Sequence, residues 1–157
     1  MAYPLANWKN YRRGYLFGVP TFYSQFHLGL DVICPIGTIL YAWDDCKVVS
    51  KYGPEGGNTA WVYTDDKLFR FLHLDKPCKT GEMKVGDVIG KTGNTGKSTG
   101  PHCHLDISKN GKLELTNHKN FIDPEQYFKN INKTPVIQFV ESTPPTTTLN
   151  PVPGPNN

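Results

Sequence analysis

The chain has 157 residues, of which 38% are hydrophobic and 20% are charged, and its formal net charge is +3. This length suits a single domain with its own core, and the composition excludes an intrinsically disordered chain. The charge is too small for a nucleic-acid partner and comes without a dense stripe of lysine and arginine, but it is compatible with an anionic target such as a cell wall.

No apolar run is long enough to span a bilayer, so the sequence predicts no membrane insertion. Residues 1–13 lack the uninterrupted apolar core of a secretory signal. We therefore expect a protein without a signal peptide that is made in the cytoplasm and reaches an external target after release or by a non-classical route. We also expect a monomer.

Aromatic and β-branched runs alternate with glycine and proline along the first two thirds of the chain. They predict strands over residues 38–42, 47–52, 59–63, 67–72, 88–91 and 102–108. The segment 81–90 reads as a tight turn that leads into a buried strand. Short strands at this spacing predict a mainly β, compact antiparallel domain.

One helix is predicted near the end of the chain. Asp123 can cap it, Pro124 suits its first position, and either Tyr127 or Phe128 is expected to pack on the sheet. From residue 142 the composition changes to threonine and proline. We therefore expect a domain over 1–141 and a disordered tail or linker over 142–157.

The four cysteines are Cys34, Cys46, Cys78 and Cys103, and none form a Cys-x-x-Cys pair. This spacing argues against a zinc site built from thiolates. The even count permits disulfides, but without a secretory signal we expect reduced thiols in the core.

Histidines and one aspartate form the candidate site. His102 and His104 are two apart in a predicted strand, so both side chains point to one face, about 6.5–7 Å apart along the chain, and Cys103 points to the other. One of the two can bind a metal while the other stands beside it. The alternative is a pair of histidines on a wet strand face.

His27 and Asp31 can converge on the same metal if the backbone bends near Gly29, although alone they would pass for a surface histidine and a loop aspartate. His73 ends a hydrophobic run, where it can project into a groove or simply occupy the core or a sheet edge. His118 lies in a polar loop and receives no role.

Charge arithmetic favours hydrolysis over a structural role for such a site. Zn²⁺ with two neutral imidazoles and one carboxylate keeps a formal charge of about +1, enough to lower the pKa of bound water from ~15.7 towards 7. The sequence has no His-Glu-x-x-His motif, so the available bases are His73 and His102.

The order of four motifs resembles the M23 peptidases, the LytM/lysostaphin-type peptidoglycan endopeptidases, over residues 22–110. The motifs are His-Leu-Gly-Leu-Asp, Gly-Thr-Ile-Leu-Tyr-Ala, Leu-His-Leu and Gly-Asn-Thr-Gly-Lys-Ser-Thr-Gly-Pro-His-Cys-His-Leu. The resemblance implies an antiparallel β fold with a metal-bearing groove. It also implies zinc ligands at His27, Asp31 and His104 and catalytic histidines at His73 and His102.

Two positions depart from the family pattern, and a third matches it. Cys103 stands where the family often has leucine, and Asp106 stands where a longer acid or another residue is common. Asn58 matches a Gly-Asn position that is structural in the family. Phe22, Tyr23 and Tyr52 could line the groove, but we expect each to pack in the core.

The resemblance implies a zinc-dependent endopeptidase that hydrolyses amide bonds in the peptide stems or cross-bridges of bacterial peptidoglycan. No segment resembling an inhibitory propeptide is visible, which suggests an open enzyme. The alternatives are a non-catalytic LytM-like module that binds the wall or activates another hydrolase, and a phage tail-associated structural component. The missing signal and the Pro/Thr-rich tail would suit a phage lysin.

Overall fold

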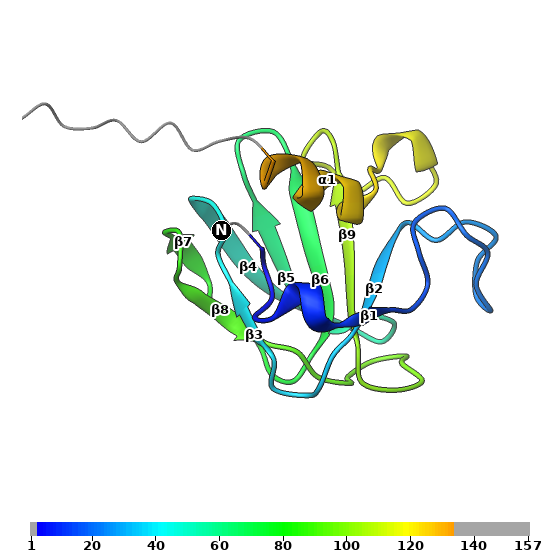
Figure 1. The fold of residues 1–157 in the computed structure, drawn as a ribbon, viewed down its shortest axis with the longest axis horizontal. Helices are drawn as coiled ribbons and strands as arrows, with labels where there is room; N and C mark the ends of the chain where they lie inside the picture. Colours follow the sequence, from blue (N-terminus) through cyan, green and yellow to red (C-terminus); the bar gives the residue numbers. More distant parts are fainter. Residues whose placement is uncertain (1–2, 134–157) are drawn as a thin grey trace, which may run out of the picture.

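The computed structural model describes residues 3–133, which form a mainly β domain around one large antiparallel sheet (Figure 1). The sheet has the strand order β1-β2-β9-β6-β5-β4-β7. Its strands are β1 (Arg12–Arg13), β2 (Gly29–Ile33), β4 (Cys46–Gly53), β5 (Gly57–Tyr63), β6 (Leu68–Leu74), β7 (Gly81–Met83) and β9 (Cys103–Ser108). This architecture confirms the predicted fold class.

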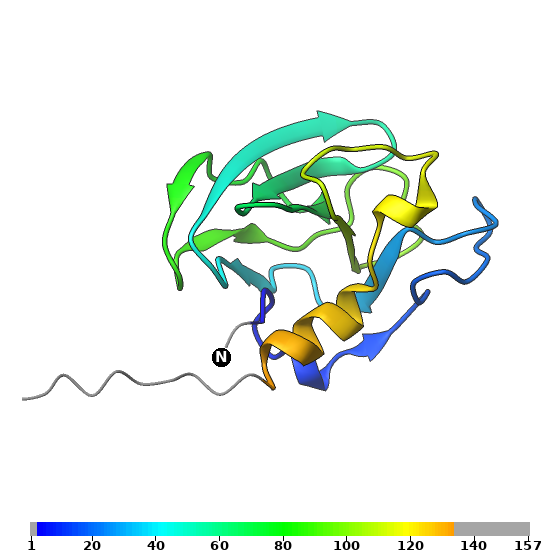
Figure 2. The ribbon, with the colours of Figure 1, turned by 90° about the horizontal axis from the view of Figure 1, so that it is seen from above.

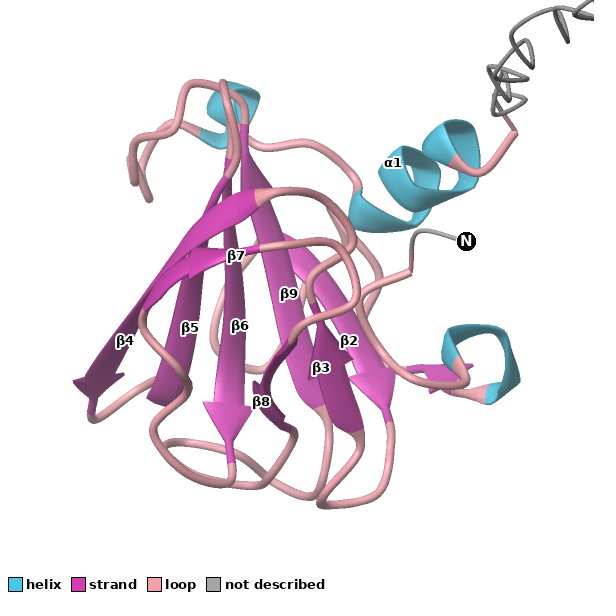
Figure 3. Ribbon diagram, turned by 90° about the vertical axis from the view of Figure 1, so that its left-hand side faces the viewer, coloured by secondary structure: helices cyan, strands magenta, loops and turns pink. Residues whose placement is uncertain are grey.

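Smaller elements cover one side of the large sheet (Figures 2 and 3). They are the antiparallel pair β3 (Ile39–Tyr41) and β8 (Val88–Lys91), the 3-10 helix η1 (Trp8–Asn10) and the α-helix α1 (Pro124–Ile131). A second 3-10 helix, η2 (His118–Asn120), lies beyond the end of β9, where the Asn120 side chain donates a hydrogen bond to the Ser108 hydroxyl. Among the described residues α1 is the longest helix, and its eight residues fall far short of a bilayer span.

All six predicted strands are present with bounds shifted by at most a few residues, but β1, β2 and β7 were not predicted. β2 contains Gly29 and Asp31, two residue types that are rare in strands. Four of its five residues are buried, so it shows no alternation. β7 lies in the segment predicted as a turn, where Met83 pairs with Cys46 at the start of β4.

The hydrophobic core lies between the large sheet and the elements that cover it. In β6, Phe69 and Phe71 are fully buried on this side. The centroid of the Trp43 ring lies 4.7 Å from that of Phe69 and 5.3 Å from that of Phe128 in α1. Phe128 is fully buried, so the predicted packing of the helix is confirmed.

The predicted helix start is also confirmed. Asp123 is the N-cap, and its side chain accepts hydrogen bonds from the backbone N–H groups of Glu125 and Gln126 at 2.9 and 3.4 Å. Pro124 occupies the first turn, where its missing N–H group costs nothing. The predicted tail over 142–157 lies outside the described residues.

The four cysteines are free and buried, in agreement with the prediction of reduced thiols. Burial raises the pKa of each thiol, and for Cys46 burial and the nearby carboxylates of Asp44 and Asp45 raise it to about 11. Cys103 is fully buried, as expected for a side chain that points away from its histidine neighbours.

The expectation that Phe22, Tyr23 and Tyr52 pack in the core is wrong. Their exposed fractions are 89%, 64% and 75%. Phe22 and Tyr23 lie in a tight turn, in which the Thr21 hydroxyl accepts hydrogen bonds from the backbone N–H groups of Tyr23 and Ser24. Such a turn holds its side chains away from the sheet.

Candidate metal centre

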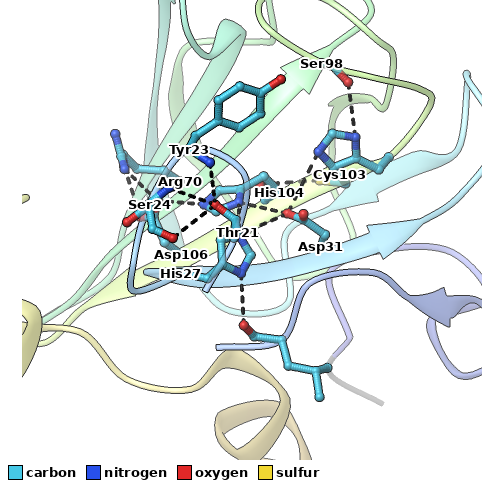
Figure 4. Close-up of polar contacts among 12 residues, drawn as sticks. Thr21, Tyr23, Ser24, His27, Asp31, Arg70, Ser98, Cys103, His104 and Asp106 are labelled. Atoms are coloured by element: carbon cyan, nitrogen blue, oxygen red, sulfur yellow. Dashed lines mark hydrogen bonds and ion pairs between the residues drawn. The ribbon is translucent and has the colours of Figure 1, made fainter. Parts of the chain in front are cut away.

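The strand register of the large sheet brings the candidate residues together on the face opposite the core (Figure 4). Asp31 in β2 lies directly opposite His104 in β9. Arg70 in β6 lies directly opposite Asp106, two residues further along β9. Directly opposed residues of antiparallel strands share a face, as do residues two apart on one strand.

Three donor atoms converge at this place. Nε2 of His27 lies 3.0 Å from Nδ1 of His104 and 3.4 Å from Oδ1 of Asp31. Nδ1 of His104 lies 2.9 Å from the same carboxylate oxygen. His27, Asp31 and His104 are the one group of histidine, cysteine or acidic side chains in residues 3–133 with the spacing of a metal site.

His27 reaches the site from the loop before β2, and its backbone and ring are both fixed. Its N–H group donates to the carbonyl of Val19 at 2.9 Å, and its carbonyl accepts from Gly18 at 2.8 Å. The ring Nδ1 donates to the carbonyl of Leu16 at 3.1 Å. The ring therefore presents its Nε2 lone pair to Asp31 and His104.

We predicted that the backbone bends near Gly29, but Gly29 lies within strand β2 and serves the site by allowing close packing. A Cβ atom at this position would stand 2.2 Å from the Leu105 carbonyl oxygen and 2.9 Å from Nε2 of His104. Only glycine lets β2 approach β9 this closely while the imidazole lies against it.

The electrostatics of the site favour a cation among these donors. Burial opposes ionisation of Asp31, but hydrogen bonds from His104 and His27 hold the pKa of this carboxyl well below its usual range. Burial would also lower the pKa of His104, but Asp106 and Asp31 raise it to about 9. The metal-free His104 ring is therefore positively charged at neutral pH, and its charge lies in the place where a metal ion would be held.

His102 stands beside the three donors. Its Nε2 lies 3.8 Å from Oδ1 of Asp31, and its Nδ1 donates to the carbonyl of Gly100 at 2.8 Å. The Ser98 hydroxyl donates to the same carbonyl at 2.9 Å and lies 3.2 Å from Nδ1. The loop before β9 thus fixes the proton on Nδ1 and leaves Nε2 available.

His73 faces His102, with ring centroids 4.7 Å apart. Its Nδ1 donates to the carbonyl of Thr95 at 2.7 Å, so its available nitrogen is also Nε2. Burial, together with the positive character of His102 and His104, lowers the pKa of His73 to about 4. The imidazole is therefore neutral at neutral pH.

The backbone of His73 is strained. Its φ of 64° places it in the left-handed region, which non-glycine residues rarely adopt. Two hydrogen bonds hold the conformation: the His73 N–H group donates to the Gly56 carbonyl at 2.7 Å, and the Thr95 hydroxyl donates to the Leu74 carbonyl at 2.6 Å. This twist near the end of β6 turns the ring toward His102.

Two adjoining hollows form a groove through the site. One hollow, of about 290 Å³, extends over the floor made by Arg70 and Leu72 to a rim that includes Tyr23 and Lys97. The other hollow is lined by Gly14, Ile33, Gly100 and Pro101. Both hollows are also lined by Tyr15, Asp31, Thr99 and His102, so the groove continues on either side of the candidate centre.

Sequence reasoning gave no function to several residues of the groove. Asp106 could have been found, because it lies two residues after His104 on one strand and so shares its face. Arg70, which binds Asp106, carries no such signal, because its position depends on the register of β6 against β9. His118, which received no role, stacks on Phe26 at 4.6 Å.

Comparison with known proteins agrees with this geometry. The model of the family "Peptidase family M23" matches residues 25–115, more than half of the chain. Over 89 residues the chain is 38% identical to the peptidoglycan DD-endopeptidase ShyC of Vibrio cholerae, an alignment that covers 54% of this chain and 21% of that protein. The chain thus spans about a fifth of that relative's length.

Solved structures share the fold. The catalytic domain of the antimicrobial peptidase lysostaphin from Staphylococcus simulans superposes with a TM-score of 0.67 at 30% identity, covering 77% of this chain and 94% of that domain. A zinc-containing peptidase from Vibrio cholerae superposes with a TM-score of 0.58 at 33% identity, covering 68% of this chain and 35% of the other.

The segment that matches the family model contains the three donors and both additional histidines of the groove. The predicted resemblance is thereby confirmed over nearly the same residues, and the chain belongs to peptidase family M23.

Proposed function

We propose that the chain is a zinc-dependent endopeptidase that hydrolyses amide bonds in the peptide part of bacterial peptidoglycan. The observation that carries the proposal is the convergence of three metal-donor atoms and two further imidazoles on one groove. Relatives named as a peptidoglycan DD-endopeptidase and as a zinc-containing peptidase support the substrate class and the metal.

The donor set fits zinc. A tetrahedral ion with bonds of about 2.0–2.1 Å separates its ligand atoms by roughly 3.4 Å, and the three donor atoms lie 2.9–3.4 Å apart. His27, Asp31 and His104 would be the ligands. Zinc bound there would polarise the scissile carbonyl and acidify the attacking water.

His102 and His73 would move the protons of the reaction. Each donates its Nδ1 proton to a backbone carbonyl, so each presents an Nε2 lone pair that can accept a proton from water. The imidazolium formed can then donate that proton to the leaving amine. His73 is neutral at neutral pH and so starts the cycle able to accept a proton.

The groove supports an endopeptidase because it has room on both sides of the centre. An extended peptide could cross both hollows with its scissile amide above Asp31 and His102. On the rim, Nζ of Lys97 lies 4.5 Å from the centre of the Tyr23 ring and 3.7 Å from the Glu55 carboxylate. These exposed groups could contact the amide, carboxylate and amine groups of a peptide stem.

Digestion of purified sacculi tests the proposal directly. The zinc-loaded chain is expected to release fragments with new amino termini, which mass spectrometry would identify together with the bond cleaved. Chelator-treated protein should release none until zinc is restored. The His102→Ala variant, which keeps all three proposed ligands, serves as the folded control. If the zinc-loaded protein generates no new amino termini from sacculi of several cross-bridge types, the proposal fails.

A further inference from the structure

We propose that Asp106, supported by Arg70, is a positioning residue that holds the His104 ring in the orientation and the tautomer that a metal ligand needs. The inference rests on the proposed zinc site, but it concerns residues outside the three donors. It predicts that zinc affinity depends on a carboxylate and a guanidinium that themselves bind no metal.

The argument starts from the two nitrogens of His104. Nδ1 belongs to the donor set, 2.9 Å from Asp31 and 3.0 Å from His27. Nε2, on the far edge of the ring, lies 3.3 Å from Oδ2 of Asp106. A neutral imidazole has one N–H group, so donation from Nε2 to Asp106 leaves the Nδ1 lone pair free for a metal.

Asp106 is held in place from behind. Nε of Arg70 donates to its Oδ1 at 2.9 Å, and a terminal nitrogen of Arg70 donates to its Oδ2 at 2.5 Å. This two-point contact fixes the plane of the carboxylate. Asp106 is 1% exposed, so this geometry is shielded from water.

The far edge of the ring is also confined sterically. A Cβ atom on Gly29 would stand 2.9 Å from the same Nε2 atom. With β2 against one side of Nε2 and Asp106 accepting its proton, the ring has little freedom to swing away from Asp31. Gly29, Asp106 and Arg70 together therefore fix the orientation of the His104 ring.

The contrasting interpretation is that Arg70 and Asp106 are only an ion pair that joins β6 to β9. The chain offers a matched comparison. Arg13 in β1 donates to Glu125 in α1 at 2.7 and 3.4 Å, also at two points and also between distant segments. No hydrogen bond or ion pair joins Arg13 or Glu125 to His27, Asp31 or His104 among the interactions of residues 3–133.

The test measures zinc affinity by competition with a chromophoric chelator. The double variant Arg70→Met/Asp106→Leu replaces the buried ion pair by apolar side chains, a change that proteins often tolerate without loss of stability. We expect this variant to fold, as judged by circular dichroism, and to bind zinc about 10–100-fold more weakly than the wild type. Glu125→Gln should bind zinc as the wild type does.

A second readout reports on the ring itself. In zinc-loaded protein, ¹H–¹⁵N spectra should show a slowly exchanging Nε2 proton of His104 in the wild type and in Glu125→Gln. The same signal should exchange rapidly in the double variant. A mere strand-joining ion pair would leave both the affinity and this signal unchanged.

A folded double variant that binds zinc within twofold of the wild type would overturn the inference. If the double variant does not fold, Asp106→Asn decides, because a neutral amide is a weaker acceptor than a carboxylate. A loss of about tenfold supports the inference and an unchanged affinity overturns it. Absence of zinc binding by the wild type would instead overturn the proposed function.

Discussion

The two faces of strands β6 and β9 differ completely in chemistry, although successive residues of the same strands alternate between them. On the covered face, Phe69, Phe71 and Leu105 are at most 1% exposed and join the aromatic core. On the open face, Arg70 and His104 stand in a network of ionisable groups. The covered face supplies the free energy of folding, and the open face uses the resulting rigidity to hold charged groups at fixed distances.

This contrast implies that stability and chemistry can be disrupted separately. A change on the open face should remove metal binding or turnover from a protein that still folds. A change on the covered face should lower the free energy of unfolding first. The following predictions test this separation, beginning with the largest effect.

Removal of a proposed ligand should have the largest effect on activity. Asp31→Ala or His104→Ala leaves two ligands, too few for a catalytic zinc site. We expect loss of stoichiometric zinc together with a fall in sacculus digestion of about a thousandfold or more, measured by metal analysis and fragment release. A His104→Ala variant that digests sacculi at the wild-type rate would contradict the metal assignment.

Removal of a proton-transferring imidazole should separate metal binding from turnover. His102→Ala should retain zinc, because His102 is not among the donors, but it should lose turnover by about 10²–10⁴-fold. Metal analysis and digestion rates on one preparation provide the check. Wild-type turnover in this variant would assign proton transfer to His73 alone.

Truncation of neighbouring residues of β6 should lower the free energy of unfolding by very different amounts. Phe71→Ala removes a fully buried ring, and we expect the free energy of unfolding to fall by about 3–5 kcal/mol. Leu72→Ala, on the half-buried groove floor, should cost only about 1 kcal/mol. Denaturant titrations of the zinc-free proteins measure both, and equal losses would refute the division into two faces.

The smallest effect concerns the pH dependence of stability. The pKa of Cys46 is raised from 9.0 to about 11 in the folded protein, so the folded state holds its thiol proton more tightly than the unfolded state does. The resulting stabilisation is complete below pH 9 and is lost as the pH rises towards 11. Denaturant midpoints should therefore fall across this range, and less steeply in Cys46→Ala, whose pH dependence serves as the comparison.

Much of this molecule could be predicted from local sequence. Strands β4, β5 and β6 alternate or carry aromatic and β-branched residues, and Asp123-Pro124 marks the helix start unambiguously. The four histidines and the aspartate of the site could be named because paired metal-ligand spacing and ordered motifs are local features. Their predicted convergence on one groove matches the structure.

The remainder depends on contacts between distant segments. The sequence around Gly29 and Asp31 shows a weak strand signal, because packing against β9 and not propensity makes it a strand. The partnership of Arg70 with Asp106 depends on the β6–β9 register, which no local pattern specifies. Exposure of Tyr23 follows from a turn closed by the Thr21 hydroxyl, whereas its aromatic ring alone favours burial.

The left-handed backbone at His73 is a conformation that histidine adopts only with strain. Glycine would adopt that φ without steric strain, at the cost of the imidazole. In a His73→Gly chain the relief of strain should therefore offset part of the stability lost with the buried ring and its hydrogen bond to Thr95, while His27, Asp31 and His104 stay intact. Such a folded form with slowed chemistry would be a suitable trap for capturing an uncut wall fragment in the groove.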